Sequence, residues 1–157
     1  MSRTLASLVL VALWLGAALL TVAVVAPGAF AVLPTRAMAG EMVGQVLPAV
    51  FVGAIAVPAL VLVIAPEARR SIAALTGSVV SALAAGAALF IVDPKIAALR
   101  AAAGLPIDQL SAADPRRVLF GLLHAASVAL LGLAMVALAA VLVALARTVL
   151  PTLRAAR

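Results

Sequence analysis

Four apolar stretches without Asp, Glu, Lys or Arg dominate the chain, at about 5–25, 46–65, 72–92 and 118–145. A helix needs about 20 apolar residues to cross the roughly 30 Å of hydrocarbon in a bilayer. Each stretch is therefore long enough to span a membrane once. Apolar residues make up 68% of the sequence, more than a soluble domain of this size can bury. The sequence predicts an all-α integral membrane protein with a single transmembrane domain over residues 1–157.

The connections between these stretches differ in length and character. Only residues 66–71 join the second and third stretches, so those helices form a tight antiparallel hairpin. Residues 28–45 are moderately apolar and are expected to lie along the membrane surface. Residues 93–117 hold most of the acids and contain a short interfacial helix, which Asp93 caps and Pro94 begins. The predicted architecture is an antiparallel four-helix transmembrane bundle with interfacial segments in the first and third connections.

The placement of basic residues indicates an orientation. The first apolar run is longer than the roughly 7–15 residues of a signal-peptide core, which favours a retained helix. Four spans put both termini on the side of residues 66–71, and the positive-inside rule then favours cytoplasmic termini. An alanine-rich, arginine-rich composition favours a bacterial inner membrane. The terminal side holds Arg3, Arg69, Arg70, Arg147, Arg154 and Arg157, against Arg36, Lys95, Arg100, Arg116 and Arg117 opposite.

The net charge of +6 invites a nucleic-acid interpretation, but the basic residues sit at the ends of apolar segments. Four Phe and one Trp offer no stacking platform for bases. The lipid bilayer is therefore the expected partner, and no nucleic acid is expected. The absence of cysteine excludes disulfides, thiolate metal sites and cysteine nucleophiles.

Small residues indicate where helices pack, since membrane helices need them to approach closely. The third stretch has a ladder at i, i+4 and i+8, and the fourth has a pair four residues apart. These positions are expected to pack inside one bundle, while a membrane-protein partner or a homo-oligomer stays open. The residues are Ser78, Ala82 and Gly86, Gly121 and Ala125, with a further GxxxG at Gly40 and Gly44.

The single histidine, His124, lies seven residues beyond Arg117, roughly 10 Å into the fourth span. Helical spacing places Arg117, His124 and Ser127 on one stripe. Ser127 is expected near the midplane, and Trp14 and Ser81 fall at a similar depth when counted from the ends of their own spans. These five residues form the candidate functional polar cluster. Arg100 and Arg116 are the candidate interfacial charges.

The chemistry open to this cluster is limited. No Asp or Glu lies within a predicted span, so His124 has no acid to orient it and no catalytic residue is assigned. His124 and Met135 are too few donors for a metal site, so no metal and no cofactor are assigned. Two uses of His124 stay open: a hydrogen bond between helices, or a proton-linked or ligand-binding role, because intramembrane ionisable groups are costly.

Several short motifs together resemble a known family. Phe120, Leu123, His124 and Ser127 resemble the fourth-helix signature of the transmembrane protein 205-like proteins, whose bacterial members carry domain of unknown function 4149. The first span resembles that family's Trp-x-Gly followed by Pro and Phe. An Ala-Gly segment and a Pro…Leu-Arg stretch also match. The further matching residues are Trp14, Gly16, Pro27, Phe30, Ala39, Gly40, Pro94, Leu99 and Arg100.

The resemblance runs from about residue 11 to 140 and implies a four-helix membrane domain with no assigned activity. One departure is Leu131, where the family commonly has Asn, so that amide is missing here. The predicted function is a non-enzymatic multi-pass membrane protein, as a transporter-like or accessory membrane subunit. The alternative is a haem- or metal-associated membrane redox or enzyme subunit that uses His124.

Overall fold

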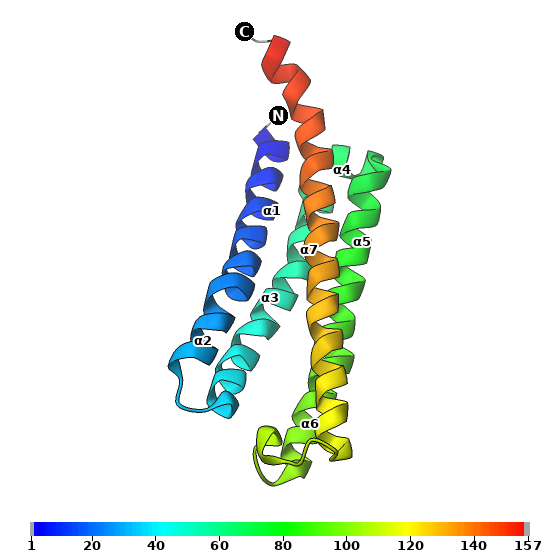
Figure 1. Ribbon diagram of the computed structural model, residues 1–157. Helices are drawn as coiled ribbons and strands as arrows, with labels where there is room; N and C mark the ends of the chain where they lie inside the picture. Colours follow the sequence, from blue (N-terminus) through cyan, green and yellow to red (C-terminus); the bar gives the residue numbers. More distant parts are fainter. Residues whose placement is uncertain (1, 156–157) are drawn as a thin grey trace.

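The computed structural model describes residues 2–155, and over that range all regular secondary structure is helical. Four long helical rods run side by side, and the chain ends lie with α4 at one end of the bundle (Figure 1). We call this the terminal end, and the opposite end, with α2 and α6, the loop end. The elements are α1 (Ser2–Leu20), η1 (Thr21–Val25), α2 (Ala26–Val32), α3 (Arg36–Ile64), α4 (Pro66–Arg70), α5 (Ile72–Ala87), η2 (Ala88–Val92), α6 (Asp93–Ala103), η3 (Ile107–Gln109) and α7 (Pro115–Ala155).

The four predicted spans are confirmed, but the helices that contain them are longer than predicted. Their apolar candidate spans are Arg3–Val32, Arg36–Ile64, Ile72–Ala103 and Pro115–Val149. No described residue is in a β-strand. The two ends and α4 share one side, as the order of spans requires (Figure 1).

The first connection differs from the prediction. Residues 28–45 were expected to lie along the membrane surface, whereas only residues 33–35 are non-helical. The rest extend the first two rods as α2 and the start of α3. Thr35 makes this possible, because its hydroxyl accepts a hydrogen bond from the backbone N–H of Met38 at 3.2 Å and caps α3.

Two π-helices carry the rods past prolines that were expected to end them. In η1 the N–H of Ala26 bonds the carbonyl of Thr21, and Pro27 follows. In η2 the N–H of Asp93 bonds the carbonyl of Ala88, and Pro94 follows. The wider turn lets the helix absorb a residue that lacks an N–H. The two halves of the chain thus share one order: long helix, π-turn, short helix, turn, long helix.

This continuity corrects the interpretation of Asp93. The sequence placed it at the end of the third span as a helix cap, and excluded carboxylates from the spans. Asp93 instead lies half-buried inside the helical run Ile72–Ala103 and makes no capping hydrogen bond, and Val92 precedes α6 in helical conformation. The run ends at Gly104, whose φ of 69° is the left-handed conformation that terminates helices.

Packing between α5 and α7 depends on Gly77 more than on the predicted ladder. A Cβ at Gly77 would lie 2.7 Å from the carbonyl oxygen of Ala137. A Cβ at Gly86 would meet nothing within 4 Å, and the same is true at Gly121. Ala125 is exposed. The close approach of the two helices is therefore at Gly77, one residue before Ser78, the first position of the predicted ladder.

Candidate functional site

Trp14 on α1 is a buried polar anchor against α3. Its indole Nε1–H donates to the backbone carbonyl of Val50 at 3.0 Å. Gly53 makes room for the ring, since a Cβ there would lie 2.6 Å from Cδ1 of Trp14. Trp14 thus packs against a neighbouring helix, and its N–H has a partner there.

Ser81 on α5 bonds the same face of α3 one turn further on. Its hydroxyl donates to the carbonyl of Ala54 at 2.9 Å, in a fully buried contact. In a regular helix that carbonyl would accept from residue 58, but Pro58 has no N–H. Ser81 thus supplies the donor that Pro58 removes. The buried hydroxyl of Ser78 has no hydrogen-bond partner among the described residues.

Ser81 does not lie at the depth of Ser127, where the sequence placed it, and is still further from His124. Gly77 faces Ala137, and α5 and α7 run in opposite directions (Figure 1). Ser81 is one turn nearer the loop end, so it lies near the level of Leu133. Ser127 is buried roughly 9 Å further along α7, and His124 roughly 14 Å further. The sequence estimate measured depth from the ends of apolar runs, whereas the helices continue beyond those runs.

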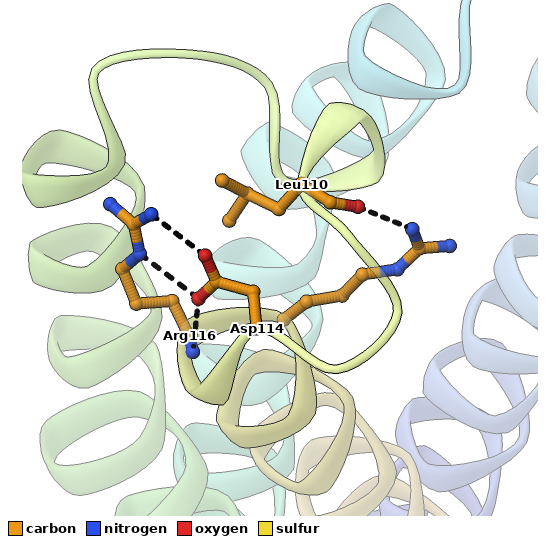
Figure 2. Close-up of polar contacts among 4 residues, drawn as sticks. Leu110, Asp114 and Arg116 are labelled. Atoms are coloured by element: carbon orange, nitrogen blue, oxygen red, sulfur yellow. Dashed lines mark hydrogen bonds and ion pairs between the residues drawn. The ribbon is translucent and has the colours of Figure 1, made fainter.

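Arg117 holds the loop before α7 instead of facing the bundle. Its Nη1 donates to the carbonyl of Leu110 at 2.6 Å and to that of Asp108 at 3.3 Å. Figure 2 shows the contact with the Leu110 carbonyl beside the Asp114–Arg116 pair. Arg116 and Arg117, both singled out in the sequence, therefore have structural partners in the loop that precedes α7.

Asp114 caps the start of α7 and forms the single ion pair among the described residues. Its Oδ1 accepts from the backbone N–H of Arg116 at 2.8 Å and from Nε at 3.1 Å, and Oδ2 lies 2.8 Å from Nη2. The side-chain hydrogen bonds from Arg116, followed by its backbone N–H, lower the pKa of Asp114 below its ordinary value.

His124 lies on the outer surface of α7, exposed, and makes no hydrogen bond within the described part of the chain. Its imidazole stacks on Phe120, one turn earlier, with ring centroids 6.2 Å apart and planes 3° apart. The guanidinium carbon of Arg100 on α6 lies 5.3 Å from the Phe120 centroid. We call Arg100, Phe120 and His124 the cation–aromatic stack. Of the two uses left open for His124, the hydrogen bond between helices is not formed among the described residues, and the imidazole stacks on a ring of its own helix.

The stack also reaches α3. A Cβ at Gly40 would lie 3.4 Å from Nη2 of Arg100, and one at Gly44 would lie 3.5 Å from Nη1. The GxxxG pair therefore receives a guanidinium instead of another helix backbone. The i, i+4 spacing of Phe120 and His124 could have indicated their contact, but nothing local links residue 100 to residues 40 and 44.

Two shallow grooves flank this region at the loop end. One holds about 290 Å³ and is lined by Leu33, Met38, Glu41, Met42 and Gln45. The other holds about 530 Å³ between α6 and α7, and its lining is mostly apolar. Its residues are Lys95, Ala98, Leu99, Ala102, Leu119 and Leu123.

The donor set does not fit a metal or haem held by one chain. No group of three His, Cys, Asp or Glu residues comes together among the described residues. His124 and Met135 share the continuous helix α7, so they are separated by roughly 16 Å of helical rise. Two ligands of one metal ion must lie within a few ångströms of each other.

Fold and site together define a four-span helical membrane protein with a cation–aromatic stack on its outer face. The chain belongs to the family defined by domain of unknown function DUF4149, whose model matches residues 9–104. The match runs from within α1 to the end of α6 and includes Trp14 and Arg100, but not the motif around His124. No curated protein and no solved structure matches the chain significantly.

Proposed function

We propose that the protein is a non-enzymatic accessory subunit of a bacterial inner membrane, which acts through lateral contacts within the bilayer. One observation carries the proposal: Arg100 and His124, which make no hydrogen bond within the described part of the chain, are on the outside of the bundle. Trp14 and Ser81, inside it, are bonded to carbonyls of α3.

The interior favours an accessory role over a transporter-like one. A permeation route needs polar groups that a solute can reach in sequence across the membrane. Here the centre of the bundle is packed with buried Val, Ala and Leu side chains around Phe51 and Leu138. Among the residues that the structure describes, Ser78 is the one with a buried hydroxyl that lacks a partner, and a single hydroxyl makes no pathway.

The proposal also includes membership of the transmembrane protein 205-like group and an orientation with cytoplasmic termini. The motif Phe120-x-x-Leu123-His124-x-x-Ser127 supports membership of the transmembrane protein 205-like group. The excess of arginine at the terminal end supports cytoplasmic termini. A membrane-protein partner or a second copy of the chain would dock on the face that carries His124.

Site-specific photocrosslinking in native membranes tests lateral contact. Val128 is 55% exposed and lies one turn beyond His124 on the same face, whereas Leu133 is 48% exposed on the opposite face of α7. A photoreactive residue at Val128 should give one discrete adduct, identified by mass spectrometry, and the same residue at Leu133 should not. Equal patterns at both positions would contradict the proposal.

Liposomes reconstituted with the purified full chain provide the complementary test. An accessory subunit should add no proton or ion flux above that of protein-free liposomes. Flux that depends on the protein and is lost in His124→Ala would establish a transport function and overturn the accessory role. Comparing thermal stability of the two proteins separates lost function from lost folding.

A further inference from the structure

We propose that Arg100 binds the phosphate of an anionic lipid headgroup at the loop end, with Phe120 and His124 completing the site. This inference does not depend on the accessory role, because a lipid site can be present whichever partner the protein serves. It concerns the outer surface where α3, α6 and α7 meet.

The guanidinium is positioned before any ligand arrives. The ring of Phe120 lies under its carbon at 5.3 Å, a distance at which the cation–π attraction is effective. The missing side chains of Gly40 and Gly44 let its nitrogens approach α3. A planar fork fixed by two helices can bind two phosphate oxygens with little loss of conformational freedom.

The same guanidinium has no anionic partner among residues 2–155. The one ion pair among the described residues joins Arg116 and Asp114, and Arg100 makes no hydrogen bond within that part of the chain. Arginine remains charged at every relevant pH and has five N–H donors. An anion from outside the protein would satisfy them.

Nearby carboxylates do not take this role. Asp93 is on the same face of α6 but two turns deeper, roughly 10 Å away by helical rise. Glu41 lines the separate groove beside Met38 and Met42. Neither forms an ion pair with Arg100.

The surroundings favour a lipid over a free anion. Phe120 is one turn inside Arg116 and Arg117, so the stack lies at the depth of headgroups and the first acyl carbons. The 530 Å³ groove begins at the residues next to it, Leu99 and Leu119. Its alanine and leucine lining suits an acyl chain, and Lys95 adds a second positive charge. An exposed histidine beside the phosphate offers a further N–H donor.

Native mass spectrometry of the detergent-solubilised full chain tests the site, with phosphatidylglycerol or phosphatidylcholine as the added lipid. Arg100→Gln should weaken phosphatidylglycerol binding about tenfold, as expected for losing charge-assisted hydrogen bonds. Arg36→Gln is the matched control, because it removes an exposed arginine at the same end of the bundle. That control should change binding by less than about twofold, as a distant surface charge does.

Each other outcome overturns the proposal. Equal losses in the two variants would indicate attraction to net charge alone, and unchanged binding in Arg100→Gln would exclude the site. Displacement of phosphatidylglycerol by millimolar inorganic phosphate would identify the ligand as free phosphate. Should Arg100→Gln fail to fold, Arg100→Lys decides: it keeps the charge but loses the fork, so unchanged phosphatidylglycerol binding would exclude bidentate recognition.

Discussion

A proline and a serine on different helices act as a pair at the scale of single residues. Pro58 leaves the carbonyl of Ala54 without its helical donor, and Ser81 provides one from α5. A buried carbonyl without a partner is costly in a membrane, where no water can replace the lost bond. The Ser81 hydroxyl therefore stabilises the fold by replacing the helical hydrogen bond that Pro58 cannot donate.

The effect of Ser81→Ala should depend on residue 58. Alone, the substitution should lower the free energy of unfolding by about 1 kcal/mol, since the Ala54 carbonyl loses its donor. In a Pro58→Ala background the restored N–H can serve that carbonyl, so the loss should shrink. Unfolding in mixed micelles measures all four proteins of this cycle. Equal losses in both backgrounds would show that the proline and the serine are not coupled.

Contacts between whole helices depend on where one backbone meets another. Gly77 and Gly86 are both on α5, yet only Gly77 has the α7 backbone against it. Their sequence surroundings, rich in alanine and leucine, do not distinguish them. The register between α5 and α7 does, and that register is a property of the packed pair.

Alanine at these two glycines should therefore have opposite effects. Gly77→Ala places a Cβ 2.7 Å from a backbone oxygen that cannot move away, and should destabilise the protein by about 1–3 kcal/mol. Gly86→Ala adds a Cβ in open space and should be neutral or stabilising by up to about 1 kcal/mol through helix propensity. Thermal unfolding in detergent compares them. A similar change for both would mean that α5 and α7 do not touch at Gly77.

The start of α7 should respond to acid. Because Arg116 lowers the pKa of Asp114 in the folded protein, the carboxylate stabilises the fold above the ordinary pKa of 3.8, and this is lost as pH falls toward the lower folded value. Melting temperatures of the wild type and Asp114→Asn should converge below about pH 4 and separate above it. Asp108→Asn, which removes a carboxylate of the same loop outside the ion pair, serves as the control. A constant difference across pH would contradict the assignment.

The whole molecule places α4 and both chain ends on one side and the loop before α7 on the other (Figure 1). The chain contains no cysteine, so single cysteines report accessibility without background. Glu67 on α4 and Asp108 before α7 are both exposed. They therefore mark the two sides of the membrane.

Impermeant maleimide labelling of intact spheroplasts tests this arrangement and the proposed orientation. Asp108→Cys should be labelled from outside, and Glu67→Cys only after permeabilisation. The reverse labelling pattern would agree with the four-span arrangement but would contradict the proposed cytoplasmic location of the termini. Labelling of both positions from the same side would contradict the four-span arrangement itself.

Local sequence determined the membrane class, the number of spans and their antiparallel order, because each span must satisfy its own backbone within an apolar run. It also identified Trp14 and His124 as polar residues within membrane spans, where an unpaired polar group costs free energy. It did not determine where the helices end. Pro27 and Pro94 are signals to stop, and only the π-turns before them reveal that the helices continue.

Tertiary structure alone decided which polar residues meet. Arg100 approaches residues 40 and 44 on α3 and stacks over Phe120 on α7, and such contacts depend on helix register and rotation. Ser81 and Ser127, which the sequence placed together, are separated because α5 and α7 are staggered. Periodicity fixes the face on which a residue lies along its own helix, whereas packing between small residues fixes what that face meets.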